Sequence, residues 1–431
     1  MLNIIDQLVK TILPVFKKAI FLLFLIATSF GVYGQNTWTG SNSSNWHDAG
    51  NWTGDIPTAA EDVGIPAGST VIVDGADAEA ASVTFGSENN SQTTLQVNAS
   101  YTLTVSGDIG LESSDGNDVY SEITGGGSIE CNNLISGEGT PDLNGFWDAY
   151  TNTTNLELNI NNIFINNNLI LEGYGETSNF WGGTWYRLSN PNLTINSGRV
   201  IVNGTVETNN ENDNNTSTFT LGNNSPHIIL NGNTPFALDG TGTNNLTLNG
   251  SGATVEYGGS GTQIVYDTDY SNLSVTGTGV KEVNSNLTIP GTFNSGAQLD
   301  VTANITFNGP VNCNGGTMNA TSGVVTYNTA ATNVIPGLYN NLTKTGGGTS
   351  TLCGDVTVSN ILDLDNGIIR LADADLMVSG AITGTFDANN MIETNGAGKL
   401  IKQGTDAGLS IVYPVGSAGY YTPMDLTNGI A

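Results

Sequence analysis

The sequence is poor in positive charge. Lys and Arg total 10 against 39 Asp and Glu in 431 residues, which gives a formal net charge of -29. So few cations cannot neutralise phosphates, and the composition therefore argues against binding to nucleic acid or to an anionic membrane surface. Charged residues of both signs make up only 11% of the chain. The exposed faces of a helical bundle need more, so that fold class is excluded as well.

Cysteine is also scarce, with Cys131, Cys313 and Cys353 as the three in the chain. No Cys-x-x-Cys pair occurs, so a structural zinc site has no support. Cys313 and Cys353 lie about two coils apart in the repetitive architecture argued below, which places their Cα atoms beyond disulfide reach. We expect buried thiols that act as small hydrophobic residues, with one disulfide as the alternative.

Long hydrophobic runs are missing except near the N-terminus. There Lys17 and Lys18 precede an apolar run from Ala19 to Ala27, and small residues follow up to Gly34. This order predicts that residues 1–34 are a signal peptide, with a buried N-terminal helix as the alternative. The run is too short to span a bilayer, so no transmembrane segment is expected in the mature chain. We expect export to the medium or the outer cell surface.

Gly and Asn are abundant, with 56 of each. Short runs of β-branched residues end in Gly or Asn, as at 70–75, 101–107 and 199–204. Each run is typical of one strand followed by a tight turn, because Gly and Asn tolerate the positive φ that such turns require. The sequence therefore predicts an all-β fold.

Two kinds of repeat are present. A short motif, Asn followed by Leu or Ile and then Thr or Ser, begins at Asn192, Asn245, Asn272, Asn286, Asn304 and Asn341. It matches the N-glycosylation pattern, but strand chemistry in an Asn- and Thr-rich chain explains it better, with Asn side chains forming ladders between turns. A longer repeat of 69 residues relates 255–289 to 325–358, and matches Tyr257 with Tyr327 and Tyr270 with Tyr339.

Repeats of this size favour a parallel β-solenoid over residues 76–395, with coils of about 18–23 residues. Tandem Ig-like β-sandwiches of about 70–90 residues are the alternative, because the 69-residue offset fits them too. Aromatic residues are only 8% of the chain. A sandwich core wants more large aromatics and a clearer in–out alternation, so we favour the solenoid.

The N-terminal and C-terminal segments carry motifs of a known kind. The first runs through Thr37-Trp38-Thr39-Gly40, Asn45-Trp46, Asn51-Trp52, Pro57 and Asp62-Val63-Gly64-Ile65-Pro66; the second holds Tyr413-Pro414-Val415-Gly416 and Tyr421-Thr422-Pro423-Met424. The chain resembles secreted, adhesin-like β-helix repeat surface proteins of Bacteroidota, which are often exported by the type IX system. The resemblance implies secretion, a β-helical body and an adhesive role. From it we expect a Trp-rich cap (35–75), the solenoid, and the start of a C-terminal β-rich module (396–431). Because such proteins usually end in a sorting domain, a fragment and a self-contained chain are the alternatives for this sequence.

Aromatic residues suggest two places where a sugar could stack. Trp147, Trp181, Trp185, Tyr186 and Arg187 form one candidate ligand-binding cluster, in which aromatic rings stack on sugars and Arg187 donates hydrogen bonds. The alternative is a loop packed on the flank of the solenoid. The second place is Trp38, Trp46 and Trp52, which we expect to close the first coil rather than to bind sugar.

A calcium site is the one cofactor hypothesis. Its candidate ligands are Asp363, Asp365, Asn366, Asp373 and Asp375, beside the turn residue Gly367. Oxygen ligands at alternate positions with a turn glycine suit Ca²⁺, but the rest of an EF-hand series is missing, and a plain turn is the alternative.

No arrangement of catalytic residues stands out. Carboxylates are scattered, the two histidines are His47 and His227, and nucleophile and phosphate-loop motifs are lacking. We therefore expect a non-catalytic structural or adhesive protein whose partner is a polysaccharide or a host or neighbouring cell surface. A carbohydrate-binding protein is the second hypothesis, and a β-helical polysaccharide-degrading enzyme the third.

Overall fold

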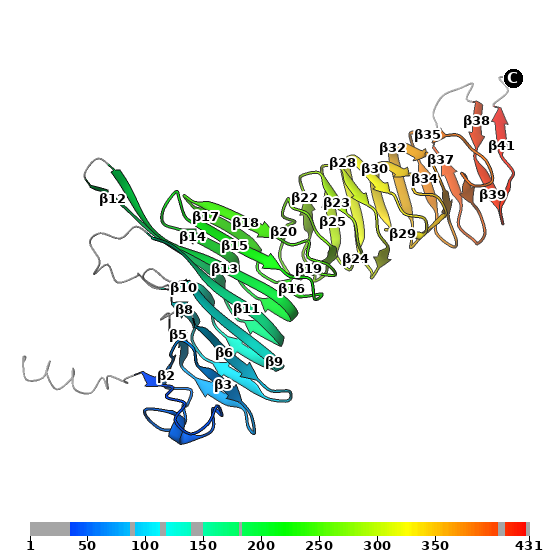
Figure 1. Cartoon of the computed structure of the whole chain (residues 1–431). Coiled ribbons are helices and arrows are strands. Elements are labelled where there is room, and N and C mark those ends of the chain that lie inside the picture. Colours follow the sequence, from blue (N-terminus) through cyan, green and yellow to red (C-terminus); the bar gives the residue numbers. More distant parts are fainter. Residues whose placement is uncertain are drawn as a thin grey trace, which may run out of the picture.

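The protein is an all-β parallel solenoid. The computed structural model describes residues 35–86, 91–112, 118–138, 150–180, 183–403 and 410–427; the predicted signal peptide lies outside them. Strands stack along one long axis, which changes direction near β19 and β20 (Figure 1). Almost every neighbouring pair of strands is parallel, as in β2–β5, β16–β19 and β32–β34. Ig-like sandwiches are antiparallel, so the sandwich alternative is wrong.

The coils build three faces, and each coil contributes to all or most of them. Face 1 holds β2 (Asp62–Ile65), β5 (Ser82–Phe85), β8 (Ile109–Glu112), β10 (Leu134–Glu138), β12 (Leu169–Phe180), β14 (Val206–Asn210), β17 (Phe236–Gly240), β20 (Gln263–Ile264), β22 (Lys281–Val283), β25 (Gln298–Val301), β34 (Leu376–Val378) and β37 (Leu400–Lys402). Face 2 holds β3 (Thr70–Val73), β6 (Gln92–Val97), β15 (Thr216–Leu221), β18 (Thr243–Thr247), β23 (Leu287–Ile289), β26 (Ile305–Phe307) and β35 (Ala381–Gly384).

Face 3 holds β4 (Ala78–Ala80), β7 (Thr102–Val105), β16 (His227–Leu230), β19 (Thr254–Tyr257), β21 (Asn272–Val275), β24 (Phe293–Ser295), β27 (Val311–Cys313), β29 (Thr332–Val334), β31 (Thr349–Leu352), β33 (Ile368–Arg370), β36 (Ile392–Glu393) and β39 (Val415–Ser417). Longer strands turn a corner of the coil. β9 (Val119–Cys131), β11 (Tyr150–Ile165) and β13 (Gly183–Val202) serve faces 2 and 3, whereas β28 (Thr317–Tyr327), β30 (Gly337–Lys344) and β32 (Val356–Leu364) serve faces 1 and 2.

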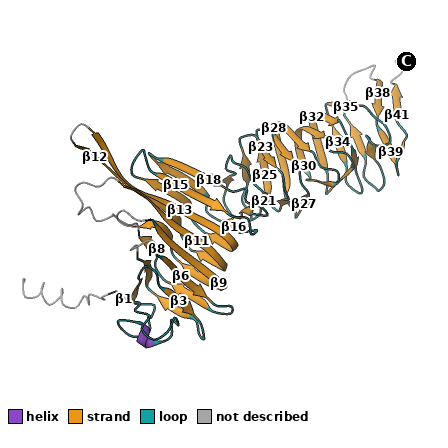
Figure 2. Cartoon of the chain, in the orientation of Figure 1, coloured by secondary structure: helices purple, strands orange, loops and turns teal. Residues whose placement is uncertain are grey.

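The remaining elements lie at the two ends. β1 (Asn36–Thr37) and the 3₁₀ turn η1 (Ala49–Asn51) belong to the N-terminal cap, as Figure 2 shows. β38 (Ser410–Tyr413), β40 (Tyr420–Tyr421) and β41 (Met424–Thr427) form antiparallel pairs at the C-terminal end. The parallel stack begins with the β1–β2 pair inside the predicted cap and continues through β37 and β39 into the predicted C-terminal module. Among the described residues no helix has the length and apolar character to cross a membrane.

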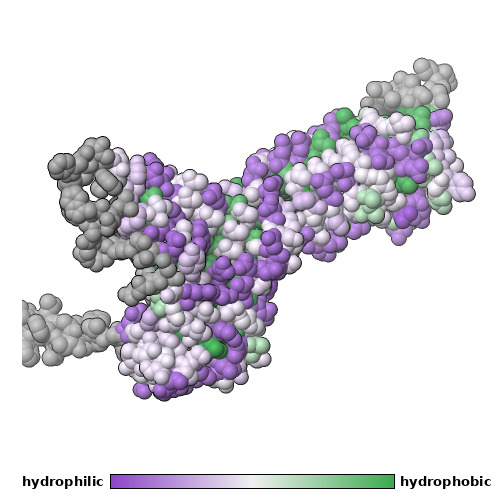
Figure 3. All heavy atoms as spheres, viewed as in Figure 1, coloured by the Kyte–Doolittle hydropathy of each residue, from purple (hydrophilic) through white to green (hydrophobic). Residues whose placement is uncertain are grey.

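The core is a set of apolar columns inside the coils. On face 2, Leu95, Ile123, Leu158, Ile195 and Leu221 lie in register on successive strands, and each is at most 1% exposed. Strand residues alternate between this interior and the surface, as in the burial of β6. The outer surface is correspondingly polar over most of the face seen in Figure 3.

Asn and Asp side chains tie each turn to the next. The Oδ1 atom of Asp108 accepts a hydrogen bond from the backbone N–H of Asn133 (3.1 Å), Asn133 Oδ1 accepts one from Asn168 (2.9 Å), and Asn168 Oδ1 accepts one from Thr205 (2.9 Å). Side-chain contacts between turns, such as that from Asn328 Nδ2 to Asn308 Oδ1 (2.9 Å), add to these hydrogen bonds. The expected Asn ladders are therefore confirmed.

The same contacts measure the length of the coils. Asn286 Oδ1 accepts from the Asn304 N–H and Asn304 Oδ1 from the Val324 N–H, over 18 and 20 residues. In the first half of the stack, the Asn133 and Asn168 contacts span 35 and 37 residues. The expected coil of about 18–23 residues holds in the second half and for the step of 20 residues from β2 to β5. It is wrong for the coil between β11 and β13, where the hairpin of β12 and β13 lengthens the coil.

Two tyrosine pairs explain the 69-residue repeat. Among the described residues, no backbone ladder joins β17 to β20 on face 1 or β18 to β23 on face 2. At this interruption the hydroxyl groups of Tyr257 and Tyr270 are hydrogen-bonded to each other (2.8 Å). The Tyr257 hydroxyl also accepts a hydrogen bond from the Tyr266 N–H (2.9 Å), and the Tyr270 hydroxyl donates one to the Tyr266 C=O (2.7 Å). The two phenols thus satisfy a backbone segment at the interruption, where an unpaired buried group is costly.

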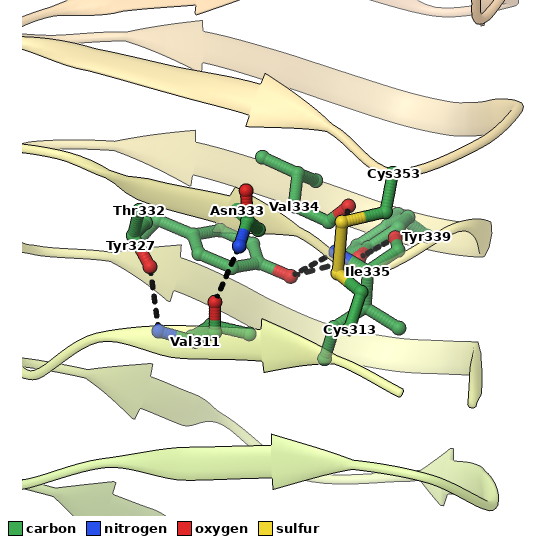
Figure 4. Close-up of a disulfide and its surroundings, with 9 residues drawn as sticks. All are labelled: Val311, Cys313, Tyr327, Thr332, Asn333, Val334, Ile335, Tyr339 and Cys353. Atoms are coloured by element: carbon green, nitrogen blue, oxygen red, sulfur yellow. Dashed lines mark hydrogen bonds between the residues drawn. A yellow bond between two sulfur atoms is a disulfide. The ribbon is translucent and has the colours of Figure 1, made fainter. Parts of the chain in front are cut away.

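The second pair lies at a second interruption, between β27 and β29 on face 3. Tyr327 and Tyr339 share a hydroxyl contact of 3.0 Å, Tyr327 accepts from the Ile335 N–H (3.1 Å), and Tyr339 donates to the Ile335 C=O (2.6 Å), as Figure 4 shows. All four tyrosines are at most 1% exposed. Burial raises the pKa of Tyr257 and of Tyr327 to about 12, so the network stays protonated at neutral pH.

A disulfide joins Cys313 to Cys353, and the expected free thiols at these positions are wrong. Their Cα atoms are 6.4 Å apart, less than two full coil spacings of about 4.8 Å each. The spacing estimate assumed an unbroken stack, but here Val311 contacts the next coil through side chains, with its N–H donating to Thr332 Oγ1 and its C=O accepting from Asn333 Nδ2. Cys131 is a buried free thiol, as expected.

Three tryptophans close the first coil. Trp38 and Trp46 each pack edge-to-face on Trp52 with ring centroids 4.9 Å apart, and Trp52 Nε1 donates to the Trp46 C=O (2.7 Å). All three rings are at most 5% exposed. This confirms a packing role for them, because buried rings offer no face to a sugar.

Asn304 tests the turn contacts. Asn304→Ala should lower the free energy of unfolding by about 1–2 kcal/mol, because it leaves the Val324 N–H without its acceptor. Asn304→Asp should cost less, since Asp375 Oδ1 accepts the Lys399 N–H in the same way. Urea unfolding measures both variants, and faster hydrogen exchange at the Val324 amide should accompany Asn304→Ala. Equal unfolding midpoints for the alanine variant and the wild type would contradict this role.

The disulfide closes a loop with a sequence separation of 40 residues. The double variant Cys313→Ala/Cys353→Ala should lose about 2–4 kcal/mol of stability, since the unfolded chain regains freedom. Denaturant unfolding without reductant measures the loss, and wild-type protein treated with reductant is the matched control. A wild-type midpoint that does not move on reduction would show that the bridge adds nothing.

Candidate functional site

A shallow groove lies on the outer surface of face 2, across β6, β9 and β11. It has a volume of about 310 Å³ and is lined by Gln92, Tyr120, Ser121, Glu122, Asn155 and Glu157. Gln92, Tyr120 and Asn155 are in register on the three strands, and so are Thr94, Glu122 and Glu157. Parallel strands hold such positions about 4.8 Å apart, so the groove is built from two short polar columns.

Two glutamates that line this groove occupy paired positions on neighbouring strands. Glu122 of β9 is paired directly with Glu157 of β11. Like charges on directly opposed strand positions destabilise a sheet. Amide groups offset part of the repulsion: Gln92 Nε2 donates to Glu122 Oε2 (3.0 Å), Asn159 Nδ2 to Glu122 Oε1 (2.8 Å), and Asn196 Nδ2 to Glu157 Oε2 (3.2 Å).

Tyr120 supplies the aromatic surface of the groove. Its side chain is 44% exposed, although most large apolar side chains of the stack are buried. The side chain of its neighbour Asn155 is hydrogen-bonded to the adjacent strands, because Asn155 Nδ2 donates to the Val119 C=O and Asn155 Oδ1 accepts from Asn192 Nδ2. An exposed ring beside fixed hydrogen-bonding groups is the kind of surface on which a ligand ring can stack.

The aromatic cluster predicted from the sequence lies on a projecting arm. Residues 174–180 of β12 pair antiparallel with 183–189 of β13, and Figure 1 shows this hairpin extending from the stack. Tyr186 is 37% exposed and Arg187 is half-buried, with Trp185 between Thr184 and Tyr186 on the same strand. Trp147 and Trp181 lie outside the described residues. A sugar-binding role for this cluster remains a prediction.

The predicted calcium ligands are spread around one coil, from face 2 to the turn before β34. Asp363 lies on face 2, where its Oδ1 accepts from Thr383 Oγ1 (2.7 Å). Asp373 and Asp375 accept backbone N–H groups of Ala397 (3.1 Å) and Lys399 (2.9 Å), and so tie one turn to the next. Asp365 and Asn366 are exposed in the turn after β32. Within the described parts of the chain no group of three His, Cys, Asp or Glu side chains is arranged to hold a metal ion.

Two side-chain contacts were not predicted from the sequence. Arg370 Nε lies 2.7 Å from Glu393 Oε2. His227 Nε2 lies 2.9 Å from Glu256 Oε2, and Thr276 Oγ1 donates to Glu256 Oε1 (2.6 Å). The hydrogen bond with His227 lowers the pKa of Glu256, although burial opposes it. The other histidine, His47, contacts the backbone carbonyls of Asp74 and Asp77 in the cap region.

Two lysines are buried close to the tyrosine pairs. Lys281 Nζ donates to the Gly259 C=O (2.7 Å), and Lys344 Nζ donates to the carbonyls of Thr329 (2.7 Å) and Gly347 (3.2 Å). Both are at most 1% exposed, and burial lowers the pKa of each ammonium group to about 8. They satisfy turn carbonyls from inside the coil, so their role is structural.

Comparisons with models of protein families, with curated proteins and with solved structures found no match to this chain. What the protein does is therefore inferred from its own residues. The groove was missed at the sequence level because Glu122 and Glu157 are far apart in the chain. Only the register of β9 and β11 brings them together. The alternation within each strand was the available signal, and it could not supply that register.

The buried lysines predict a pH dependence. Their pKa is about 8 in the folded protein and about 10.4 in the unfolded chain. Between these values the unfolded chain binds more protons, so their contribution makes the free energy of unfolding rise with pH. The variant Lys281→Met/Lys344→Met should lack this rise.

Denaturant unfolding of both proteins from pH 7.5 to pH 10 measures the effect. The contributions of the tyrosines and of Cys131 cancel in the difference between wild type and variant. That difference should grow in favour of the wild type as the pH rises. A constant difference would show that the lysines titrate normally in the folded state.

Proposed function

We propose that the protein is a secreted or cell-surface solenoid with a structural and adhesive role, and that it acts without catalysis. One observation carries this proposal: face 2 presents a polar column along the stack. Its register runs through Thr94, Glu122, Glu157, Thr194, Thr220 and Thr247, none of which is buried.

The second half of the stack repeats the arrangement on the same face. There the column runs through Thr288, Thr306, Thr326, Thr343, Asp363 and Thr383. Hydroxyl and carboxylate groups repeated at the strand spacing form a rigid, extended polar surface, which is how solenoid proteins contact their partners. The net charge of -29 supports solubility of such a surface.

Carbohydrate binding is the second candidate function, and the groove at Tyr120 favours it. A concave site with one exposed ring and a few fixed polar groups is typical of ligand sites. Glycoside hydrolysis uses two carboxyl groups. The Glu122–Glu157 pair is therefore the place where the third hypothesis, a polysaccharide-degrading enzyme, can be tested.

Retention on insoluble polysaccharides tests the adhesive proposal. We expect the protein to bind at least one member of a panel of neutral, amino and acidic polysaccharides, with no release of reducing ends. Trp181→Ala/Trp185→Ala and Tyr120→Ala should separate the arm from the groove as the site of binding. Failure to bind any member would overturn the adhesive proposal, and release of reducing ends would replace it with an enzymatic one.

A further inference from the structure

The free polar groups that line the groove on face 2 are mainly hydrogen-bond acceptors. The lining carboxylates of Glu122 and Glu157 can only accept hydrogen bonds when ionised. The amide of Gln92 and that of Asn159 both donate to Glu122, and Asn155 is engaged by Val119 and Asn192. No Lys or Arg is among the residues that line the groove. A ligand that fits must therefore bring hydrogen-bond donors.

The negative charge of the groove limits the class of ligand further. Glu122 and Glu157 repel each other from neighbouring strands, and nothing in the groove lining neutralises them. A cation between them would relieve this repulsion, whereas an acidic sugar would add to it on a chain with a net charge of -29. A protonated amine also interacts favourably with an aromatic face such as that of Tyr120.

The residues around the groove favour a cationic sugar chain over a metal ion or a basic peptide. Two glutamates supply too few oxygens for Ca²⁺, which takes six to eight ligands. Beyond the groove, face 2 continues with hydroxyl and amide side chains in register, Asn192, Thr218 and Asn245 beside Thr194, Thr220 and Thr247. This polar track runs along the stack axis, and it suits the hydroxyl groups of successive sugar units better than the side chains of a basic peptide.

We propose that the groove binds an oligosaccharide of amino sugars, with a protonated amine between Glu122 and Glu157 and a sugar ring on Tyr120. This inference rests on the proposed adhesive function and names its ligand class. The carboxylates select the charge, and Tyr120 supplies the stacking surface. Neutral sugars lack the amine, and polyuronates are repelled.

Calorimetric titration of the secreted protein with three soluble probes tests the assignment. A glucosamine hexamer should bind at pH 5.5, where its amines are charged, and cellohexaose should bind at least about tenfold more weakly. An oligogalacturonate should not bind. Raising the pH until the sugar amines lose their protons should remove the preference for the glucosamine hexamer.

Variants separate charge selection from folding. Glu122→Gln and Glu157→Gln keep the shape of the groove and relieve the repulsion, so they should fold normally while glucosamine affinity falls about tenfold. Tyr120→Ala should weaken binding of every sugar that binds. Tyr420→Ala is the matched control, because Tyr420 is 74% exposed at the far end of the stack. Melting curves confirm that each variant is folded.

Each other outcome has a distinct meaning. Equal binding of the glucosamine hexamer and cellohexaose, unaffected by either Glu→Gln variant, would overturn the inference and leave the adhesive function standing. Displacement by hexalysine or Ca²⁺ as effective as by the sugar would also overturn it, because the site would then recognise a cation rather than a saccharide. No binding of any probe here, and no retention on any polysaccharide above, would remove both proposals.

Discussion

The structure depends on hydrogen bonding between the backbones of successive coils. Each strand satisfies its N–H and C=O groups on the strands before and after it, and each coil places its apolar residues under those of the next. Turns also form such bonds, as from the Asn167 N–H to the Asn132 C=O. Where a backbone N–H finds no carbonyl on the neighbouring coil, an Asn Oδ1 accepts it instead, as those of Asn133, Asn168 and Asn304 do. The abundance of Asn is therefore a direct consequence of stacking many turns with few charged residues.

The same constraint explains the buried polar groups. Where the ladder is interrupted, the Tyr257–Tyr270 and Tyr327–Tyr339 pairs hydrogen-bond both backbone groups of one residue. Lys281 and Lys344 donate to turn carbonyls nearby. The Cys313–Cys353 disulfide lies at the second interruption, beside the Tyr327–Tyr339 pair. The 69-residue repeat thus duplicates a means of bridging an interruption rather than a whole number of coils.

Much of the fold could be predicted, but the site could not. Short β-branched runs that end in Gly- and Asn-rich turns, together with the repeats, predicted the parallel solenoid and its Asn ladders. Buried packing of Trp38, Trp46 and Trp52 followed from the need to cover an exposed end. The Cys313–Cys353 bridge was misjudged, because an even coil spacing was assumed where the ladder is broken. Glu122 and Glu157 drew no notice, because nothing local to either residue marks the other as its neighbour.

The sequence by itself determined the class of fold, since strand length, turn chemistry and in–out alternation are local properties that stacking amplifies. Only the tertiary structure decided which residues meet across coils. Coil length varies from 18 to 37 residues in the contacts that link successive turns, so the register of distant strands is set by packing of the whole stack. The paired carboxylates beside Tyr120 and the two tyrosine pairs exist because of that register, and no local pattern could have specified it.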